Sequence, residues 1–166
     1  PGASVISTGL TTPDPVRLQH ALHAFAAEGL KACAMEASSI GIEEHRLDGT
    51  RIRVAVFTNL TQDHLDYHGT IEDYYQAKAD WFQSLATNPH GKKPVAVINT
   101  DDAYGLQLAA SLEGKLPVLR YGFNVHCDFR ANNFRQSAKG MEFELSAKGK
   151  TFLVRAPLIG RFNVYN

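Results

Sequence analysis

Two carboxylates and two imidazoles are concentrated in one short segment, at Asp63, His64, Asp66 and His68. They come directly after the apolar run 52–58, whose length and composition predict a buried parallel strand. In open α/β sheets, ligands bind beside the carboxyl ends of the strands, where loops and helix N-termini converge. The segment therefore lies where an α/β protein places residues that bind ligands or do chemistry.

Three interpretations of this segment are compatible with the residues alone. In the first, Glu36 and His64 at two adjacent strand ends hold a magnesium ion, which in turn binds phosphate oxygens. In the second, His64 and His68 form a zinc pair at positions i and i+4 of a helix, although the Glu that follows the first His of a metalloprotease motif is missing. In the third, Asp63 and Asp66 only bond backbone amides in a turn.

Glu36 and Lys78 are charged residues in otherwise apolar patterns. Glu36 falls in the run 32–37, which has the pattern of a buried strand, where an unpaired carboxylate is costly and requires a partner such as a cation. Lys78 falls among the aromatic and apolar residues of the helical pattern 71–85. It is either functional or a lysine whose long stem carries the ammonium to water, and its position alone does not decide between the two.

Other polar residues also allow either a structural or a ligand-binding interpretation. Thr11 and Thr12 before Pro13 can start a helix or bind a ligand, and the pair Ser38-Ser39 can cap a helix or do the same. The pair Asp101-Asp102 can provide an N-cap and complement a helix dipole, or it can face a ligand.

The elements that position these residues alternate between strands and helices. Asp14 and Pro15 predict the N-cap and first turn of a helix that ends at Gly29. After the helix at 71–85, we expect a strand at 94–99, a helix capped by Asp101 that runs to about 112, and a strand at 117–121. Such alternation implies a parallel sheet flanked by helices.

The pattern changes beyond residue 121. Short alternating runs at 127–136, 140–146 and 150–156 are separated by turn residues, which predicts hairpins. We therefore expect a parallel α/β part over 1–121 and a small antiparallel sheet over 122–157.

Composition limits the class of protein. With 166 residues, 44% of them hydrophobic, the chain can bury one core. Seventeen basic residues balance seventeen acidic ones, so no field of one sign favours a nucleic acid or an anionic membrane as partner. Cys33 and Cys127 stand far apart without a C-x-x-C motif, no apolar run approaches the roughly 20 residues of a membrane span, and a signal-peptide pattern is missing. We expect a cytoplasmic protein.

Seven segments together closely resemble the Mur ligases in residue type, order and spacing. They are Thr11–Pro13, Met35–Ser39, Glu44–Arg46, Phe57–Gly69, Ala77–Lys78, Ile98–Asp102 and Gly160–Asn166. Within that family the Thr-Thr-Pro and Met-Glu-x-Ser-Ser blocks are similar to those of the tripeptide synthetases, the MurE type. The resemblance covers essentially the whole chain and maps it, 1–166, to part of the central ATPase domain.

The resemblance implies a fold, a reaction and partners. The fold is α/β, with a Rossmann-like, mostly parallel sheet flanked by helices and a small antiparallel subdomain. The reaction is ATP-dependent amide bond formation, in which UDP-MurNAc-L-Ala-D-Glu is activated as an acyl phosphate and then joined to a diamino acid, diaminopimelate or lysine, for peptidoglycan synthesis. ATP and Mg²⁺ are the implied cofactors, since charge develops on the transferred phosphoryl group.

The same resemblance implies roles for individual residues. The metal ligands are Glu36, His64 and Lys78, the last as a carbamate formed with carbon dioxide, and His64 and Lys78 are also the catalytic residues. The residues that bind the UDP-muramoyl peptide are Thr11, Thr12, Ser38, Glu44 and Arg46. The residues beside the nucleotide are Asp101, Asp102, Phe162, Asn163 and Asn166.

One departure from the family pattern bears on activity. The 166 residues contain no G-x-x-x-x-G-K-[ST], the loop that cradles ATP phosphates. We therefore expect a fragment that lacks the first strand, the phosphate-binding loop and the carboxyl-terminal domain, that does not turn over alone, and that self-associates through an open sheet edge. The alternatives are a non-catalytic nucleotide-sugar binding module and a related ligase such as folylpolyglutamate synthase.

Overall fold

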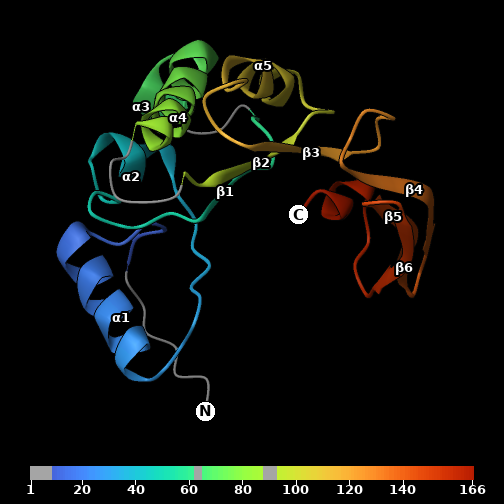
Figure 1. Cartoon of the computed structure of the whole chain (residues 1–166), viewed down its shortest axis with the longest axis horizontal. Helices are drawn as coiled ribbons and strands as arrows, with labels where there is room; N and C mark the ends of the chain where they lie inside the picture. Colours follow the sequence, from blue (N-terminus) through green and yellow to red (C-terminus); the bar gives the residue numbers. More distant parts are fainter. Residues whose placement is uncertain (1–8, 62–64, 88–92) are drawn as a thin grey trace. The chain divides into compact units, whose positions relative to one another are not determined.

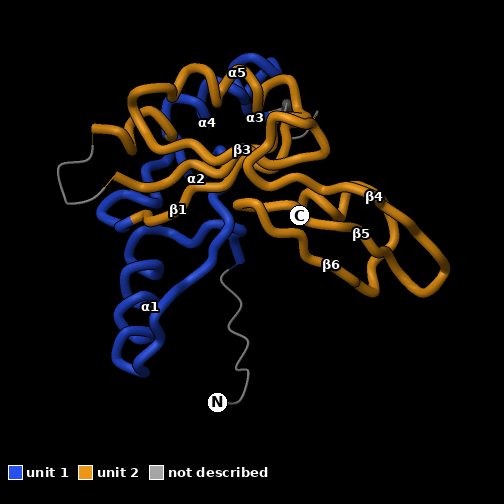
Figure 2. Tube along the Cα trace, turned by 45° about the vertical axis from the view of Figure 1, so that its right-hand side comes forward, with its two compact units in different colours: residues 1–51, 64–81 blue, residues 52–63, 82–166 orange. Residues whose placement is uncertain are grey.

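The computed structural model describes residues 9–61, 65–87 and 93–166. The chain divides into two compact units, which Figure 2 distinguishes by colour. The first unit comprises residues 1–51 and 64–81, and the second comprises residues 52–63 and 82–166. The predicted metal ligand His64 lies outside the described residues, as do Gln62 and Asp63.

One six-stranded sheet organises the second unit (Figure 1). Its strands are β1 (Val54–Phe57), β2 (Val95–Asn99), β3 (Val118–Gly122), β4 (Phe129–Ser137), β5 (Gly140–Ala147) and β6 (Lys150–Ala156). They follow one another in chain order, with β1 to β4 paired in parallel and β4 to β6 in antiparallel. The mostly parallel sheet predicted from the sequence is confirmed.

The antiparallel strands extend the parallel sheet and do not form a sheet of their own. The first residues of β4 pair with β3, Tyr121 with Phe129 and Gly122 with Arg130, while β4 pairs with β5 from its first residue to its last, with an irregularity between Asn132 and Arg135. A separate small sheet was expected because the alternating pattern reports which faces are buried, whereas it carries no information about which strand lies alongside.

Helix α5 (Ala103–Ser111) packs against β2 in the second unit (Figure 1). Ile98 of β2 and Leu108 of α5 are fully buried. Gly105 makes this close approach possible, since a Cβ there would lie 2.0 Å from the carbonyl oxygen of Asn99. The cap was assigned to the wrong aspartate: Asp102, and not Asp101, accepts a hydrogen bond of 2.9 Å from the Gly105 N–H.

Helices form the regular part of the first unit. They are α1 (Pro15–Ala27), α2 (Ser39–Glu43), α3 (Leu65–His68) and α4 (Ile71–Ala86), of which α4 continues into the second unit. Asp14 caps α1 as predicted, accepting 3.0 Å from the Arg17 N–H, and Pro15 is the first helical residue. The helical pattern at 71–85 is confirmed as α4, but the turn of helix at α3 was not expected.

The strand predicted at 32–37 is wrong. The segment has no regular secondary structure, and the side chains of Cys33 and Glu36 are exposed. Apolar composition suggests a buried strand, but a strand exists only when a neighbour completes its backbone hydrogen bonds, and none of the described strands pairs with this segment. The reason for expecting a buried carboxylate at Glu36 therefore disappears.

A second cluster of apolar side chains lies on the antiparallel part of the sheet. Ala131, Met141 and Phe143 are buried there, and Phe123 and Val164 pack against them. Val164 belongs to the 3₁₀ helix η1 (Arg161–Val164), so the terminal segment is part of this cluster. In the part of the chain that the structure describes, no helix is long and apolar enough to cross a membrane.

Strand β1 leaves one edge of the sheet open among the described strands. Ala55 and Phe57 are buried, whereas Val54 and Val56 on the other face are 55% and 56% exposed. An unpaired strand edge with exposed valines is a template for association with a second chain. The burial predicted for both faces of 52–58 is thus wrong.

We expect the 166-residue chain to self-associate through β1. In sedimentation velocity its mean mass should rise with concentration, and Val56→Lys should suppress this rise because a lysine on an edge strand opposes pairing. Val125→Lys is the control, since Val125 is 65% exposed and lies outside the strands. A monodisperse monomer for the unmodified chain at every concentration would contradict the prediction.

Candidate functional site

Four of the predicted substrate-binding residues, Thr12, Ser38, Glu44 and Arg46, are joined by hydrogen bonds in the first unit. Thr12 is fully buried, and its hydroxyl donates to the carbonyl of Glu36 at 2.9 Å and accepts from the Ser38 N–H at 2.9 Å. The Ser38 hydroxyl lies 3.1 Å from the Thr12 hydroxyl and caps α2 by accepting from the Gly41 N–H at 3.1 Å. These hydrogen bonds therefore hold Thr12 and Ser38, which are 26 positions apart in the sequence, against one another.

Arg46 joins this group from the other end of α2. One of its terminal nitrogens donates to the Thr12 carbonyl at 2.9 Å, and its Nε donates to the carboxylate of Glu44 at 2.8 Å. The Arg46 side chain is 12% exposed, while that of Glu44 is 49% exposed. The second terminal nitrogen also donates to Glu44, so three bonds orient the guanidinium, and its remaining N–H groups can contact a carboxylate or phosphate. Thr11, beside Thr12, is exposed.

Lys78 lies half-buried on α4. Burial lowers the pKa of its ammonium from the ordinary value, and the nearby carboxylate of Glu36 opposes this effect in part. The Nζ atom lies 5.0 Å from the centre of the Tyr74 ring, within the range of a cation–π contact. The environment thus favours the neutral amine more than water does, which is the form able to act as a nucleophile.

The predicted metal ligands are only partly within the described residues. Glu36 and Lys78 belong to the first unit, and the Glu36 carboxylate acts on the Lys78 ammonium, whereas His64 falls in the undescribed segment. Across residues 9–61, 65–87 and 93–166, no three His, Cys, Asp or Glu side chains are grouped so as to hold a metal ion.

His68 has a structural environment that does not suit the zinc interpretation. Its Nε2 lies 2.7 Å from the Ser39 hydroxyl, and its Nδ1 lies 3.4 Å from the Glu43 carboxylate. Both ring nitrogens therefore face protein groups, whereas a zinc ligand needs one ring nitrogen for the metal.

Asp101 organises the loop that follows β2. Its carboxylate accepts hydrogen bonds from the backbone N–H groups of Phe123 at 2.6 Å and Asn124 at 3.1 Å, and from the Tyr165 hydroxyl at 3.0 Å. Gly122 is required beside it, because a Cβ there would lie 2.7 Å from the Asp101 carboxyl carbon. Asp101 thus connects the segment after β3 to the terminal segment, which carries three of the residues predicted to lie beside the nucleotide.

Phe162, Asn163 and Asn166 lie on or just after η1. Phe162 is 66% exposed, which leaves its ring free to stack on a planar ligand. The Asn163 amide donates to the Ile159 carbonyl at 2.8 Å, and Asn166 is exposed. Asp102, besides capping α5, accepts from the Leu60 N–H at 3.4 Å.

Tyr121 and Tyr165 form a second link to the terminal segment. The Tyr121 hydroxyl donates to the Tyr165 carbonyl at 2.9 Å, and burial, followed by the effects of Tyr165 and Asp102, raises the pKa of Tyr121 to about 12. Burial and the bond to Asp101 also raise the pKa of Tyr165. Both phenols therefore remain protonated donors at neutral pH.

Alkaline unfolding should report the Tyr121 bond. The folded pKa lies above the unfolded value of about 10, so the stabilisation is complete below pH 10 and is lost as the pH rises towards 12. We expect the free energy of unfolding in urea to fall less steeply above pH 10 in Tyr121→Phe than in the unmodified chain. An equal slope for the two proteins would contradict this assignment.

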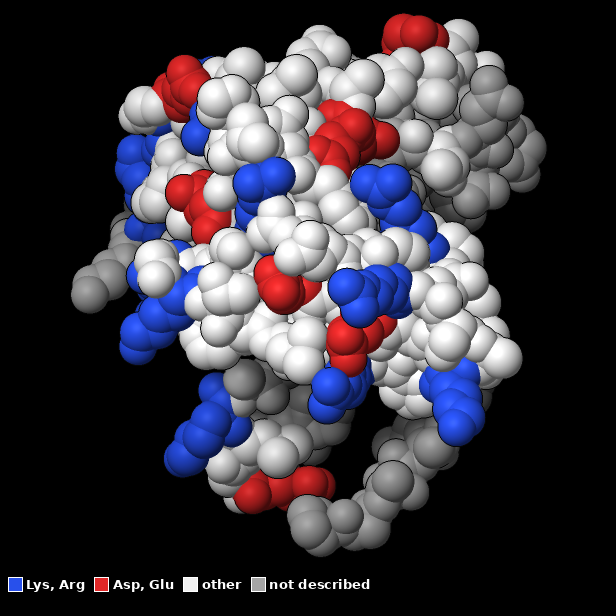
Figure 3. Space-filling view, turned by 90° about the vertical axis from the view of Figure 1, so that its right-hand side faces the viewer, with Lys and Arg blue, Asp and Glu red and all other residues white. Residues whose placement is uncertain are grey.

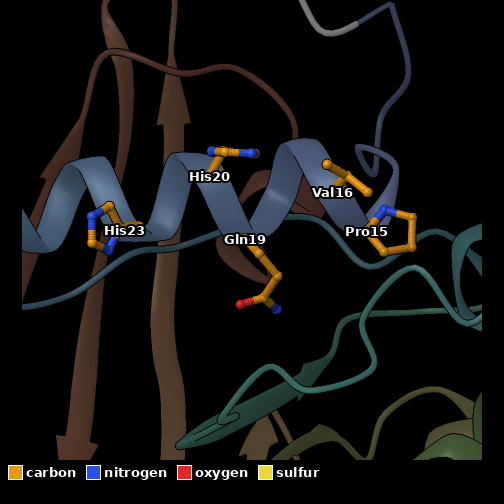
Figure 4. A pocket seen from close by; sticks show the side chains of 5 residues that line it. All are labelled: Pro15, Val16, Gln19, His20 and His23. Atoms are coloured by element: carbon orange, nitrogen blue, oxygen red, sulfur yellow. The ribbon is translucent and has the colours of Figure 1, made fainter.

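The charged side chains do not gather by sign on the part of the surface that can be seen. On the face seen in Figure 3, lysine and arginine side chains are interspersed with aspartate and glutamate, as the balanced composition predicts. A shallow depression along α1 is lined by Pro15, Val16, Gln19, His20 and His23 (Figure 4) and contains none of the predicted site residues.

Tyr74 contacts Lys78, which the sequence analysis did not predict. Tyr74 was assigned to the apolar stripe of α4, although its position four residues before Lys78 places the two side chains on one face of the helix. That spacing is a signal from which the contact could have been predicted.

Known proteins share both the sequence and the fold. The chain matches the family described as Mur ligase middle domain over residues 2–166. It is 44% identical over 161 residues to the UDP-N-acetylmuramoyl-L-alanyl-D-glutamate–2,6-diaminopimelate ligase of Acidovorax sp. (strain JS42), which covers 96% of this chain and 31% of the relative. A solved structure of a ligase with the same name has a TM-score of 0.80 at 38% identity, over 92% of this chain and 31% of that chain.

A more distant structure shares the fold alone. The MurF ligase from Thermotoga maritima, solved in complex with ADP, has a TM-score of 0.54 at 22% identity, and the match covers 69% of this chain and 25% of that one. The chain spans about a third of the length of the curated relatives that it matches.

Proposed function

Because the chain belongs to the Mur ligase family, we propose that it is part of the central domain of an ATP-dependent ligase that adds a diamino acid to UDP-MurNAc-L-Ala-D-Glu. The observation that carries this proposal is the bonded group of Thr12, Ser38 and Arg46 in the same unit as the half-buried Lys78. The relative at 44% identity is named for 2,6-diaminopimelate, which makes this the proposed amino acid.

The bonded group of Thr12, Ser38 and Arg46 is proposed to hold the UDP-muramoyl peptide. Thr12 and Ser38 fix the backbone at the start of α2, and Arg46 presents a guanidinium whose orientation is set by its bonds to the Thr12 carbonyl and to Glu44. Arg46 pairs with a carboxylate or phosphate of the substrate, and Thr11 and Glu44 supply exposed polar groups beside it. The substrate is thereby held so that its terminal carboxylate has one orientation.

Lys78 is proposed to become a carbamate. Its neutral amine attacks the carbon of carbon dioxide, an N–C bond forms, one C=O electron pair moves to oxygen, and the nitrogen releases a proton to water. The lowered pKa of Lys78 supports this step, since it increases the fraction of neutral amine. The product is a carbamate, an anionic group at a position where the unmodified lysine carries a cation.

The residue types that the family resemblance assigns to the metal, a carboxylate at Glu36, an imidazole at His64 and the carbamate of Lys78, suit a hard cation. Bound Mg²⁺ would be held by these three groups and would neutralise charge on phosphate oxygens. In the second unit, Phe162 is proposed to stack on the adenine, with Asn163 and Asn166 beside it and Asp101 and Asp102 supporting the neighbouring loops.

Phosphate release tests the proposal. The full-length protein that contains this chain is incubated with ATP, Mg²⁺, UDP-MurNAc-L-Ala-D-Glu and either diaminopimelate or lysine, and the 166-residue chain is assayed beside it. We expect release with one diamino acid from the full-length protein alone, because the chain lacks the phosphate-loop motif. Binding of the UDP-peptide without phosphate release by the full-length protein would instead indicate a non-catalytic module.

A further inference from the structure

We propose that His68 is a positioning residue that connects the start of α2 to the side chain of Lys78. The inference rests on the proposed function, because it gives His68 a task in the reaction for which Lys78 is required. His68 is not among the residues to which the family resemblance assigns substrate binding or metal ligation, and it belongs to the same unit as Lys78.

The first link is the anchoring of the imidazole. The His68 side chain is 1% exposed, and the Ser39 residue that it contacts at 2.7 Å is also 1% exposed. The second ring nitrogen faces Glu43 at 3.4 Å. Since Ser39 and Glu43 are the first and last residues of α2, the ring is held by both ends of this helix. An imidazole with both nitrogens engaged has one orientation.

The second link is a stack of aromatic rings. The His68 ring lies 5.1 Å from the Tyr74 ring at an interplanar angle of 24°, and the Tyr67 ring meets His68 edge-on at 4.9 Å and 75°. These distances and angles are in the range of favourable aromatic contacts. Stacking on His68 therefore restricts the orientation of the buried Tyr74 ring.

The third link is the contact of Tyr74 with Lys78. The Lys78 Nζ lies 5.0 Å from the centre of the Tyr74 ring. A lysine has many rotamers, so a fixed aromatic face beside its nitrogen reduces the number of positions that the nitrogen occupies. Contacts thus run without interruption from the α2 N-terminus, through His68 and Tyr74, to the amine that forms the carbamate.

At its other end this series of contacts reaches the bonded group of Thr12, Ser38 and Arg46. Ser39 follows Ser38, whose hydroxyl caps α2 and lies against Thr12. A residue that only filled the core would need no ring nitrogen. His68 instead contacts Ser39 of α2 through a ring nitrogen and stacks the face of its ring on Tyr74. The two functions can therefore be separated by substitution.

Two variants of the full-length ligase separate them. His68→Phe keeps a ring that can stack on Tyr74 and removes the bonds to Ser39 and Glu43. His68→Gln keeps a polar group that can bond Ser39 and removes the ring. His20→Gln is the matched control, since His20 is an exposed imidazole on α1 of the same unit. The carbamate carbon is observed by ¹³C NMR in ¹³C-bicarbonate, and steady-state kinetics are measured as a function of bicarbonate.

We expect His68→Gln to need about tenfold more bicarbonate for half-maximal activity and to give a weaker carbamate signal, as for other groups that orient a metal ligand. His68→Phe should keep the bicarbonate requirement of the parent enzyme and raise the KM for the UDP-peptide several-fold. His20→Gln should match the parent in all three measurements. A normal carbamate signal and bicarbonate requirement in His68→Gln would overturn the proposal, and so would identical changes in the two His68 variants.

The proposal can be tested apart from the proposed function. If the parent enzyme releases no phosphate, the ligase assignment fails, while the NMR signal still compares the Lys78 carbamate of the parent with that of His68→Gln. If His68→Gln does not fold, Tyr74→Leu removes the ring at the next link. It should weaken the carbamate signal to the same degree, and an unchanged signal would count against the proposal.

Discussion

Replacing Lys78 with methionine in the full-length ligase is expected to lower kcat at least about a hundredfold, the effect of removing a group that stabilises charge in the transition state. Methionine has a similar length and fits the half-buried position on α4, so helix packing should persist. It has no amine to form a carbamate, and the anionic group proposed beside Glu36 and His64 is lost.

The kinetic constants that change distinguish the loss of the carbamate from a general disruption of the fold. The KM values for ATP and the UDP-peptide should change little, because Thr12, Ser38 and Arg46 are bonded to one another and not to Lys78. After removal of dissolved carbon dioxide, added bicarbonate should restore the parent enzyme but not the variant. Lys31→Met is the control, because Lys31 is exposed in the same unit. Near-normal kcat in Lys78→Met would refute the carbamate.

Arg46→Lys should raise the KM for UDP-MurNAc-L-Ala-D-Glu about tenfold or more, with a smaller change in kcat, because it removes binding present before the reaction. The guanidinium donates to the Thr12 carbonyl with one nitrogen and to Glu44 with the other two. A single ammonium cannot reproduce these bonds and also face the substrate, so the exchange is not conservative here.

Two further variants identify the cause of that effect. Arg51→Lys, at an exposed arginine of the same unit, should leave the KM unchanged. Glu44→Gln removes the charge that pairs with Arg46 and keeps an acceptor. If Arg46 acted only by holding Glu44, Glu44→Gln would reproduce the KM of Arg46→Lys; a direct contact with substrate predicts a much smaller change. Initial rates measured over a range of UDP-peptide concentrations separate these results.

Local chemistry made several elements predictable. Asp14 and Pro15 define the start of α1 because the cap and the first helical residue are chosen by backbone geometry alone. The long periodic pattern of α4 and the apolar run of β2 were confirmed for the same reason, since helical periodicity and strand composition are properties of neighbouring residues.

The errors concern partners distant in sequence. The segment 32–37 has the composition of a strand but no strand pairs with it, and β4 joins β3 although its pattern is that of a hairpin. Asp101 and Asp102 are equivalent as caps in a sequence. Only the folded loop directs Asp101 to Phe123, Asn124 and Tyr165 and leaves Asp102 to cap α5.

The sequence by itself determined the family, the α/β class and the residue types of the candidate site, because motifs and periodicity are written in residue order. Only the tertiary structure decided that Thr12, Ser38 and Arg46 share one bonded group, and that His68 reaches Lys78 through Tyr74. Hydrogen bonds and ring contacts depend on distances of a few ångströms between residues, and those distances exist only once the chain has folded.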